Sequence, residues 1–138
     1  MPGSALVDTS EAVRKKVLIV EDEVLIRLVL AHDLRKAGFT VIEAATGDEA
    51  VTILQAVAEI GVIVTDVRMP GTIDGLALAR FATQLTPHIR VVIASGSHLP
   101  DMHLDADAVF AKPYLIGALI RRLHELIPTE ERARARER

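Results

Sequence analysis

The 138-residue sequence has no cysteine and very few aromatic residues. Without cysteine, disulfide bonds, thiol catalysis and cysteine-ligated metal sites are excluded. Because aromatic side chains make up only 3% of the chain, the core must be built mainly from Val, Ile, Leu and Ala. Half of the residues are hydrophobic, which allows a sizeable core at this length. The length fits one domain.

Basic blocks and long apolar runs are also missing. The net charge is -3, and no cluster of Lys and Arg interrupts the apolar body, which argues against nucleic-acid binding through charge alone. No apolar run reaches the length of a membrane span. Residues 1–16 lack the apolar middle of a signal peptide. We therefore expect a cytoplasmic protein that binds neither membranes nor nucleic acid directly.

Short apolar runs alternate with amphipathic stretches, which predict buried strands and helices respectively. The expected strands are residues 17–20, 40–44, 62–65, 90–94 and 108–111, and the expected helices are residues 24–37, 48–58, 76–85 and 115–126. Residues 98–104 have room only for a short helix. The domain is expected over residues 15–127, between an N-terminal tail of residues 1–14 and a charged C-terminal tail of residues 128–138. In the first helix, four polar side chains are expected to face solvent: Arg27, Asp33, Arg35 and Lys36.

Five strands that alternate with helices predict a parallel sheet with helices on both faces, an α/β doubly wound fold. In such sheets, ligands bind at the carboxyl ends of the strands. The predicted strand ends carry acids, a hydroxyl group and a lysine: Glu21, Asp22, Glu23, Asp66, Ser95 and Lys112. We expect these side chains to converge on one edge of the sheet.

Carboxylates that converge repel one another and need a cation. Glu21, Asp22 and Asp66 offer oxygen ligands, which favour Mg²⁺ over zinc. Magnesium commonly binds one or two carboxylates together with phosphate oxygens, and phosphoryl transfer depends mainly on positioning and charge neutralisation. Asp66 stands alone at its strand end, so it is the candidate nucleophile for an acyl phosphate. Lys112 and Ser95 would contact other phosphate oxygens.

In their order along the chain, these fragments resemble the receiver domains of response regulators. The fragments are Glu21-Asp22-Glu23, Asp66-Val67-Arg68-Met69-Pro70-Gly71, Asp74-Gly75, Ala94-Ser95-Gly96 and Lys112-Pro113. Each is weak alone, but together and on predicted strand ends they are specific, and the resemblance covers about residues 15–127. It implies a five-stranded flavodoxin-like fold, similar to the chemotaxis response regulator, that accepts a phosphoryl group on an aspartate.

The resemblance assigns roles to the residues of the predicted metal site. It implies that Asp66 is the phosphoacceptor and that Asp22 and Asp66 bind Mg²⁺ directly. Glu21 would act through water, and the backbone carbonyl of Arg68 would be the third protein ligand.

The remaining assignments concern phosphate and partners. Ser95 and Lys112 match the family's phosphate-binding residues, and the Lys112–Pro113 bond is expected to be cis, otherwise a minority form. The resemblance implies a phosphorylation switch of a two-component system rather than an enzyme. The phosphoryl donor would be a sensor histidine kinase, a phosphotransfer protein or a small acyl phosphate. A downstream protein target and a homodimer are left open.

Three features depart from the family. The loop over residues 69–75 is one residue longer than usual, which we interpret as a tolerated insertion. The usual aromatic residue three positions before the lysine is replaced by Val109, and the neighbouring Phe110 would point to the opposite face of its strand. The segment after Ser95 is several residues short, so the fourth helix is expected to be short, displaced or absent. Switching would then be read through Ser95 and residues 96–104.

Four other functions fit parts of this pattern. A receiver fold that binds partners without phosphate is favoured by the missing aromatic residue and opposed by the complete set of site residues. A phosphatase with an aspartate nucleophile needs an acid two positions later, where Arg68 stands. A nucleotide-binding enzyme needs a glycine-rich loop after the first strand, where an acidic run would repel phosphate. A zinc site at His98 and His103 lacks the spacing of a helix-face pair.

Overall fold

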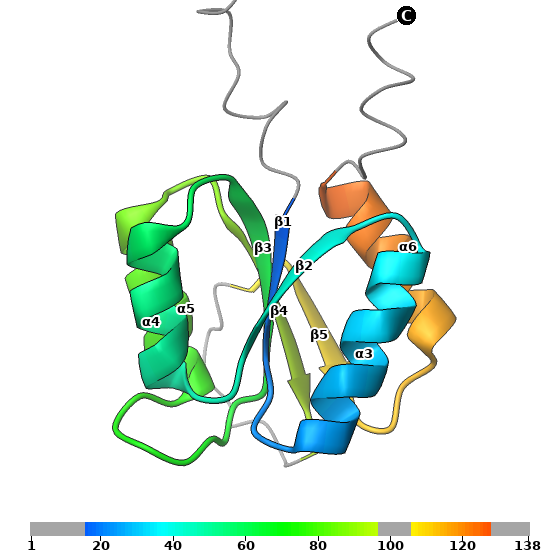
Figure 1. Ribbon diagram of the computed structural model, residues 1–138, viewed down its shortest axis with the longest axis horizontal. Helices are drawn as coiled ribbons and strands as arrows, with labels where there is room; N and C mark the ends of the chain where they lie inside the picture. Colours follow the sequence, from blue (N-terminus) through cyan, green and yellow to red (C-terminus); the bar gives the residue numbers. More distant parts are fainter. Residues whose placement is uncertain (1–15, 97–105, 128–138) are drawn as a thin grey trace, which may run out of the picture.

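The computed structural model describes residues 16–96 and 106–127, which form a five-stranded sheet with helices on both faces (Figure 1). All strand pairs are parallel, and the strand order is β2-β1-β3-β4-β5. The strands are β1 (Lys16–Val20), β2 (Thr40–Ala44), β3 (Ile60–Thr65), β4 (Arg90–Ser95) and β5 (Ala108–Ala111). The helices are α3 (Val24–Lys36), α4 (Gly47–Ala56), α5 (Gly75–Leu85) and α6 (Ile116–Leu126). The predicted doubly wound fold is confirmed.

Several sequence predictions lie outside the described residues. These are the two tails, the short helix at residues 98–104, its role in switching, and the histidines His98 and His103. Elsewhere the element bounds differ from the expected ones by at most two residues. Helix α4 ends at Ala56 rather than at residue 58, because Val57 is extended and Glu59 has a φ of 71°. Strand β3 begins two residues early, at Ile60, because that residue pairs with Lys16 of β1.

Successive side chains of a strand point to opposite faces of the sheet, so the core has two layers, one on each face. On one face, Val17 and Ile19 of β1 pack with residues of α3 and α6, among them Leu34 and Leu119. On the other face, Leu18 and Val20 pack with residues of α4 and α5. Figure 1 shows the two helix pairs on opposite sides of the sheet. With both faces buried, the carboxyl edge of the sheet remains accessible for a site.

The prediction for the solvent-facing side of α3 was wrong for Arg27. Its side chain is only 16% exposed, and its guanidinium lies 3.4 Å from Glu43 of β2 and donates to the Glu21 carbonyl at 2.9 Å. Helix rotation explains the difference, since Arg27 lies on the same side as the buried Leu30 and Leu34. The outward side of the first two turns is instead apolar, with exposed Val24, Leu25, Leu28 and Val29.

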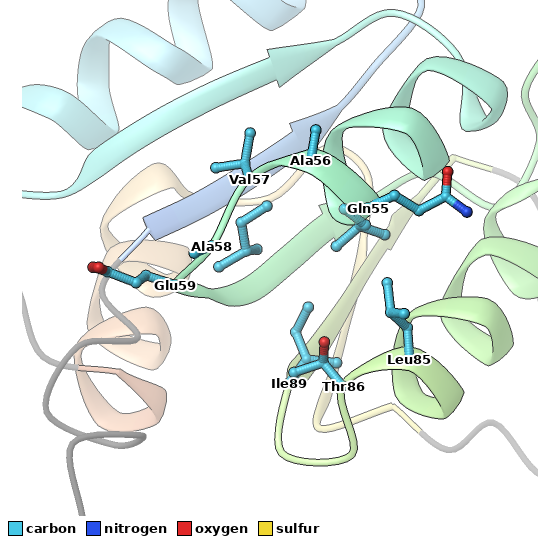
Figure 2. Close-up of a pocket in the computed structure, with 10 residues that line it drawn as sticks. Gln55, Ala56, Val57, Ala58, Glu59, Leu85, Thr86 and Ile89 are labelled. Carbon is cyan, nitrogen blue, oxygen red and sulfur yellow. The ribbon is translucent and has the colours of Figure 1, made fainter. Parts of the chain in front are cut away.

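A pocket of about 410 Å³ lies at the amino-terminal end of the strands (Figure 2). It lies between the end of α4 with its following loop and the end of α5, and its lining is mostly apolar: Leu54, Gln55, Ala56, Val57, Ala58, Glu59, Ile60, Leu85, Thr86 and Ile89. Glu59 is its one ionisable residue, so the pocket offers no group of charges for chemistry.

Within the described ranges, no helix is long and apolar enough to cross a membrane.

Candidate functional site

The ends of three strands bring Glu21, Asp66 and Lys112 into direct contact. The Nζ atom of Lys112 lies 2.8 Å from Glu21 Oε1 and 3.0 Å from Asp66 Oδ2. Glu21 follows β1, Asp66 follows the adjacent β3, and Lys112 follows β5, so the lysine reaches across the end of β4. The side chains of Glu21, Asp66 and Lys112 are 7%, 16% and 23% exposed, so the cluster is partly shielded from water.

Glu21 and Asp22 directly follow β1, but the Glu21 side chain is buried and Asp22 is exposed. The backbone of Glu21 continues the sheet, since its N–H donates to the Ala44 carbonyl at 3.0 Å. Its buried side chain accepts from the Glu23 N–H through Oε2 at 3.2 Å. Asp22 is exposed. Because Val20 pairs with Thr65, Asp22 and Asp66 lie beyond the same ends of neighbouring strands.

Asp66 occupies a tight connection between β3 and its loop. Its Oδ1 atom accepts from the Arg68 N–H at 3.3 Å, and its backbone carbonyl accepts from the Thr65 hydroxyl at 2.9 Å. The N–H of Gly75 closes the loop by donating to the Val67 carbonyl at 2.8 Å. A Cβ atom at Gly75 would lie 1.9 Å from the Asp66 carbonyl oxygen, so only glycine fits there. The loop therefore returns directly over the residue that carries the carboxylate.

Ser95 and Lys112 come together through backbone pairing of β4 and β5. Ser95 is 2% exposed and pairs with Ala111, and its carbonyl accepts from the Lys112 N–H at 2.9 Å. The Lys112–Pro113 peptide bond is cis, as expected. The backbone therefore holds the predicted hydroxyl residue and the predicted lysine side by side.

Electrostatics keep Lys112 charged. Partial burial alone would lower the pKa of the lysine, but hydrogen bonds and charge attraction from Glu21 and Asp66 outweigh it and raise the pKa above the ordinary value of 10.5. Burial likewise raises the pKa of Tyr114 above 10.0, with Lys112 opposing and the two acids adding to the shift. At neutral pH the site therefore holds an ammonium group beside the Asp66 carboxylate and a neutral phenol nearby.

The side chains of the site fit a hard cation by their chemistry, although they do not form a closed cage. Among the described residues, no three His, Cys, Asp or Glu side chains form a ready metal-binding group. In this arrangement, Lys112 bridges Glu21 and Asp66, and Asp22 is exposed. Magnesium binds through only one or two carboxylates and keeps several waters, so Asp22 and Asp66 with backbone oxygens meet its requirements. Glu21 precedes Asp22 in the sequence and shares the Lys112 ammonium group with Asp66.

The side chains of Val109 and Phe110 lie on opposite faces of β5, as the alternation along a strand predicts. Val109 is 44% exposed. Phe110 faces the opposite way and packs against the α3 and α6 core layer. Its ring centroid lies 5.7 Å from that of Tyr114. The aromatic pair is therefore part of the packing between the sheet and its helices.

Sequence reasoning missed three groups near the site. Tyr114 follows the cis-proline, and its position two residues after Lys112 was the available signal. Arg27 was assigned to the wrong side of α3. The Thr72 hydroxyl donates to the Asp48 carboxylate at 3.0 Å, a contact between residues far apart in the sequence that no local pattern indicates.

Comparison with known proteins gives a consistent result. Residues 17–124 match the response regulator receiver domain. The chain is 30% identical over 118 residues to the response regulator receiver protein CpdR of Brucella abortus, covering 82% of this chain and 97% of CpdR. It is 34% identical over 122 residues to the sensor kinase CckA of Brucella abortus, covering 83% of this chain but only 13% of the kinase. The relatives thus range from proteins of similar length to much longer ones.

Solved structures share the fold. The receiver domain from the hybrid histidine kinase CckA superposes with a TM-score of 0.68 at 34% identity, covering 80% of this chain and 97% of that one. The response regulator protein TrrA from Thermotoga maritima, solved in complex with Mg(2+)-BeF, gives a TM-score of 0.74 at 24% identity, covering 82% of this chain and 99% of TrrA. The sequence match and the strand-end site together show that this chain belongs to the response regulator receiver family.

Proposed function

We propose that Asp66 is the phosphoacceptor of this receiver, which serves as a switch in two-component phosphorelay signalling in the cytoplasm. The observation that carries the proposal is the contact of the Lys112 ammonium with Asp66 Oδ2 at 3.0 Å and with Glu21 Oε1 at 2.8 Å. The ammonium group lies beside one oxygen of the carboxylate. It can therefore attract a phosphoryl group that the carboxylate accepts.

The chemistry follows from the positions of the charges. An oxygen of the Asp66 carboxylate attacks phosphorus, a P–O bond forms, and the bond from phosphorus to the donor's histidine nitrogen or acyl oxygen breaks. The Lys112 ammonium, whose pKa is raised by its two acids, neutralises charge on a phosphoryl oxygen. The Ser95 hydroxyl, next to Lys112 through the β4–β5 pairing, donates a hydrogen bond to another.

We further propose that Mg²⁺ is held by Asp22, Asp66 and the backbone carbonyl of Arg68, with Glu21 acting through water. When bound, the metal would neutralise the phosphoryl oxygens that face the acids. The exposed position of Asp22 and the oxygen-only set of side chains support this assignment, as does the Mg(2+)-BeF bound to TrrA, which has the same fold.

The phosphoryl donor is proposed to be a histidine kinase or a phosphotransfer protein that docks beside the site. Four apolar side chains on the first turns of α3 are exposed next to the acidic loop: Val24, Leu25, Leu28 and Val29. Leu115, three residues after Lys112, is 80% exposed. Contiguous exposed apolar groups are typical of protein-binding surfaces, and these lie where a protein donor would approach Asp66.

Phospho-labelling tests the proposal. The chain is incubated with acetyl phosphate and MgCl₂, and its intact mass is measured beside that of the Asp66→Asn variant. We expect one phosphoryl group on the wild type and none on the variant. Labelling of Asp66→Asn to the same extent would refute the assignment of the acceptor.

A second candidate is a receiver that binds partners without phosphate. The observation that favours it is the exposed Val109 at the position of the usual aromatic residue, because the packing change that reports phosphorylation would be missing. The same incubation separates the two candidates. A wild-type chain that stays unmodified under conditions that label another receiver would favour the second.

A further inference from the structure

The loop over residues 68–74, which follows Asp66, is held on helix α4 by a contact from the middle of the loop. The Thr72 hydroxyl donates to Asp48 Oδ1 at 3.0 Å and lies 3.3 Å from Oδ2. Asp48 belongs to the first turn of α4, so this contact joins two segments that are separated by 24 residues. Thr72 lies within the stretch that is one residue longer than in most receivers.

The surrounding backbone is shaped for this contact. A Cβ atom at Gly47 would lie 2.4 Å from the Ile73 carbonyl oxygen, so the loop rests directly on the glycine that begins α4. Gly71, the residue before Thr72, has a φ of 101°, in the region where glycine is favoured. Two glycines therefore permit the approach that the Thr72–Asp48 hydrogen bond completes.

A simpler explanation of Asp48 exists, because an acid in the first turn of a helix interacts favourably with the helix dipole. That explanation requires no hydroxyl group from another segment. It also leaves unexplained why the loop approaches α4 so closely at Gly47 and Ile73. The geometry favours a second role, in which Asp48 anchors the loop.

We propose that the Thr72–Asp48 contact is a latch that orders residues 68–74 before any ligand binds, and that Thr72 is thereby a positioning residue for Mg²⁺. This inference rests on the proposed function, since the Arg68 carbonyl is its assumed metal ligand. A loop that is already ordered loses less conformational entropy when it binds, so its affinity is higher. Thr72, within the lengthened stretch, supplies the hydroxyl of this contact.

The test compares Thr72→Val with two controls. Valine keeps the shape of threonine and the charge of the site but removes the hydroxyl donor. Thr72→Ser restores the donor. Thr52→Val is the matched control, because Thr52 is exposed on α4 and its hydroxyl donates to the backbone carbonyl of the same Asp48 at 3.3 Å.

Two properties are measured on each folded variant. Hydrogen exchange of the amides of residues 68–74 is followed in metal-free protein, and the Kd for MgCl₂ is measured by calorimetric titration. For Thr72→Val we expect faster exchange in this loop and Mg²⁺ binding weaker by about three- to tenfold, the loss expected for one hydrogen bond. Thr72→Ser and Thr52→Val should stay within about twofold of the wild type.

Each outcome decides the question. Wild-type exchange or a wild-type Kd in Thr72→Val overturns the latch, and so does an equal loss in Thr52→Val. If the wild type itself binds no Mg²⁺, the proposed function fails, and the metal role of Thr72 fails with it. If the wild type binds Mg²⁺ and is labelled while Thr72→Val binds it equally well, only the latch fails.

Discussion

The charged cluster and strand β5 are joined at Lys112 but match the receiver family to different degrees. In the cluster, the Lys112 ammonium contacts both Glu21 and Asp66, at the strand ends where the resemblance to receivers places these residues. In β5, Val109 is exposed where an aromatic residue is usual, and Phe110 packs inward. The cluster depends on where strands end, whereas a packing switch depends on which face of a strand carries an aromatic ring. One residue of displacement along β5 therefore moves the aromatic ring to the other face of the strand without changing the position of Lys112.

The largest expected effect comes from the packing beneath Asp66. Gly75→Ala should lower the free energy of unfolding by about 3 kcal/mol, because its Cβ atom would collide with the Asp66 backbone. Gly117→Ala is the control, since a Cβ atom there meets nothing within 4 Å and should stabilise α6 by about 0.5 to 1 kcal/mol. Urea unfolding measures both variants. Equal stabilities would contradict the tight fit of the loop on Asp66.

The two switch positions of β5 should differ in stability. Phe110→Ala should cost about 2 kcal/mol, because Phe110 packs with Tyr114 and the α3 and α6 layer. Val109→Ala should change the free energy of unfolding by no more than about 0.5 kcal/mol, because Val109 is exposed. Thermal or urea unfolding compares the variants. A larger loss for Val109→Ala would mean that Val109 holds a packing role.

Removal of the lysine should affect the chemistry more than the fold. Lys112→Ala should slow labelling by acetyl phosphate at least about tenfold, since a charged hydrogen-bond donor is lost. The free energy of unfolding should fall by only about 1 kcal/mol, because Lys112 itself is 23% exposed and water can reach the two acids once the ammonium group is removed. Lys16→Ala, at the other end of β1, is the control for both measurements. Unfolding of Lys112→Ala would show that this lysine is mainly structural.

The smallest effect is a titration that the composition makes easy to follow. Tyr114 is the single tyrosine and the chain has no tryptophan, so the ultraviolet absorbance of tyrosinate reports this residue alone. Its pKa should lie above 10.0, and Lys112→Met should raise it further, because Lys112 opposes the shift. A pKa at or below 10.0 in the wild type would contradict the burial of the phenol, which is the main cause of the raised pKa.

The same raised pKa values predict how stability changes at high pH. Both Tyr114 and Lys112 have pKa values in the folded protein above their ordinary values of 10.0 and 10.5. Their contribution to stability is therefore fully present below about pH 10 and is lost as the pH rises through the folded pKa values. The wild type should therefore lose stability between neutral pH and about pH 11, as measured by urea unfolding, and a free energy of unfolding that stays constant over this range would contradict the raised pKa values.

The fold and most of the cluster could be predicted because both depend on local signals. Alternating apolar runs indicated the strands, and the carboxyl ends of parallel strands share one edge, so Asp66 and Lys112 could be expected to lie together. Arg27 could not be placed, because its partner Glu43 lies on a neighbouring strand and its polarity suggested solvent. The Thr72–Asp48 contact could not be predicted either, because it depends on how a loop rests on a distant helix.

The most direct measurement of the central claim is the position of the phosphoryl group. After incubation with acetyl phosphate and MgCl₂, reduction with borohydride converts an aspartyl phosphate into homoserine, which peptide mass spectrometry locates. The charged cluster predicts homoserine at position 66 and nowhere else. Homoserine at position 22, or a chain that remains unmodified while a reference receiver is labelled, would contradict the assignment of Asp66 as the acceptor.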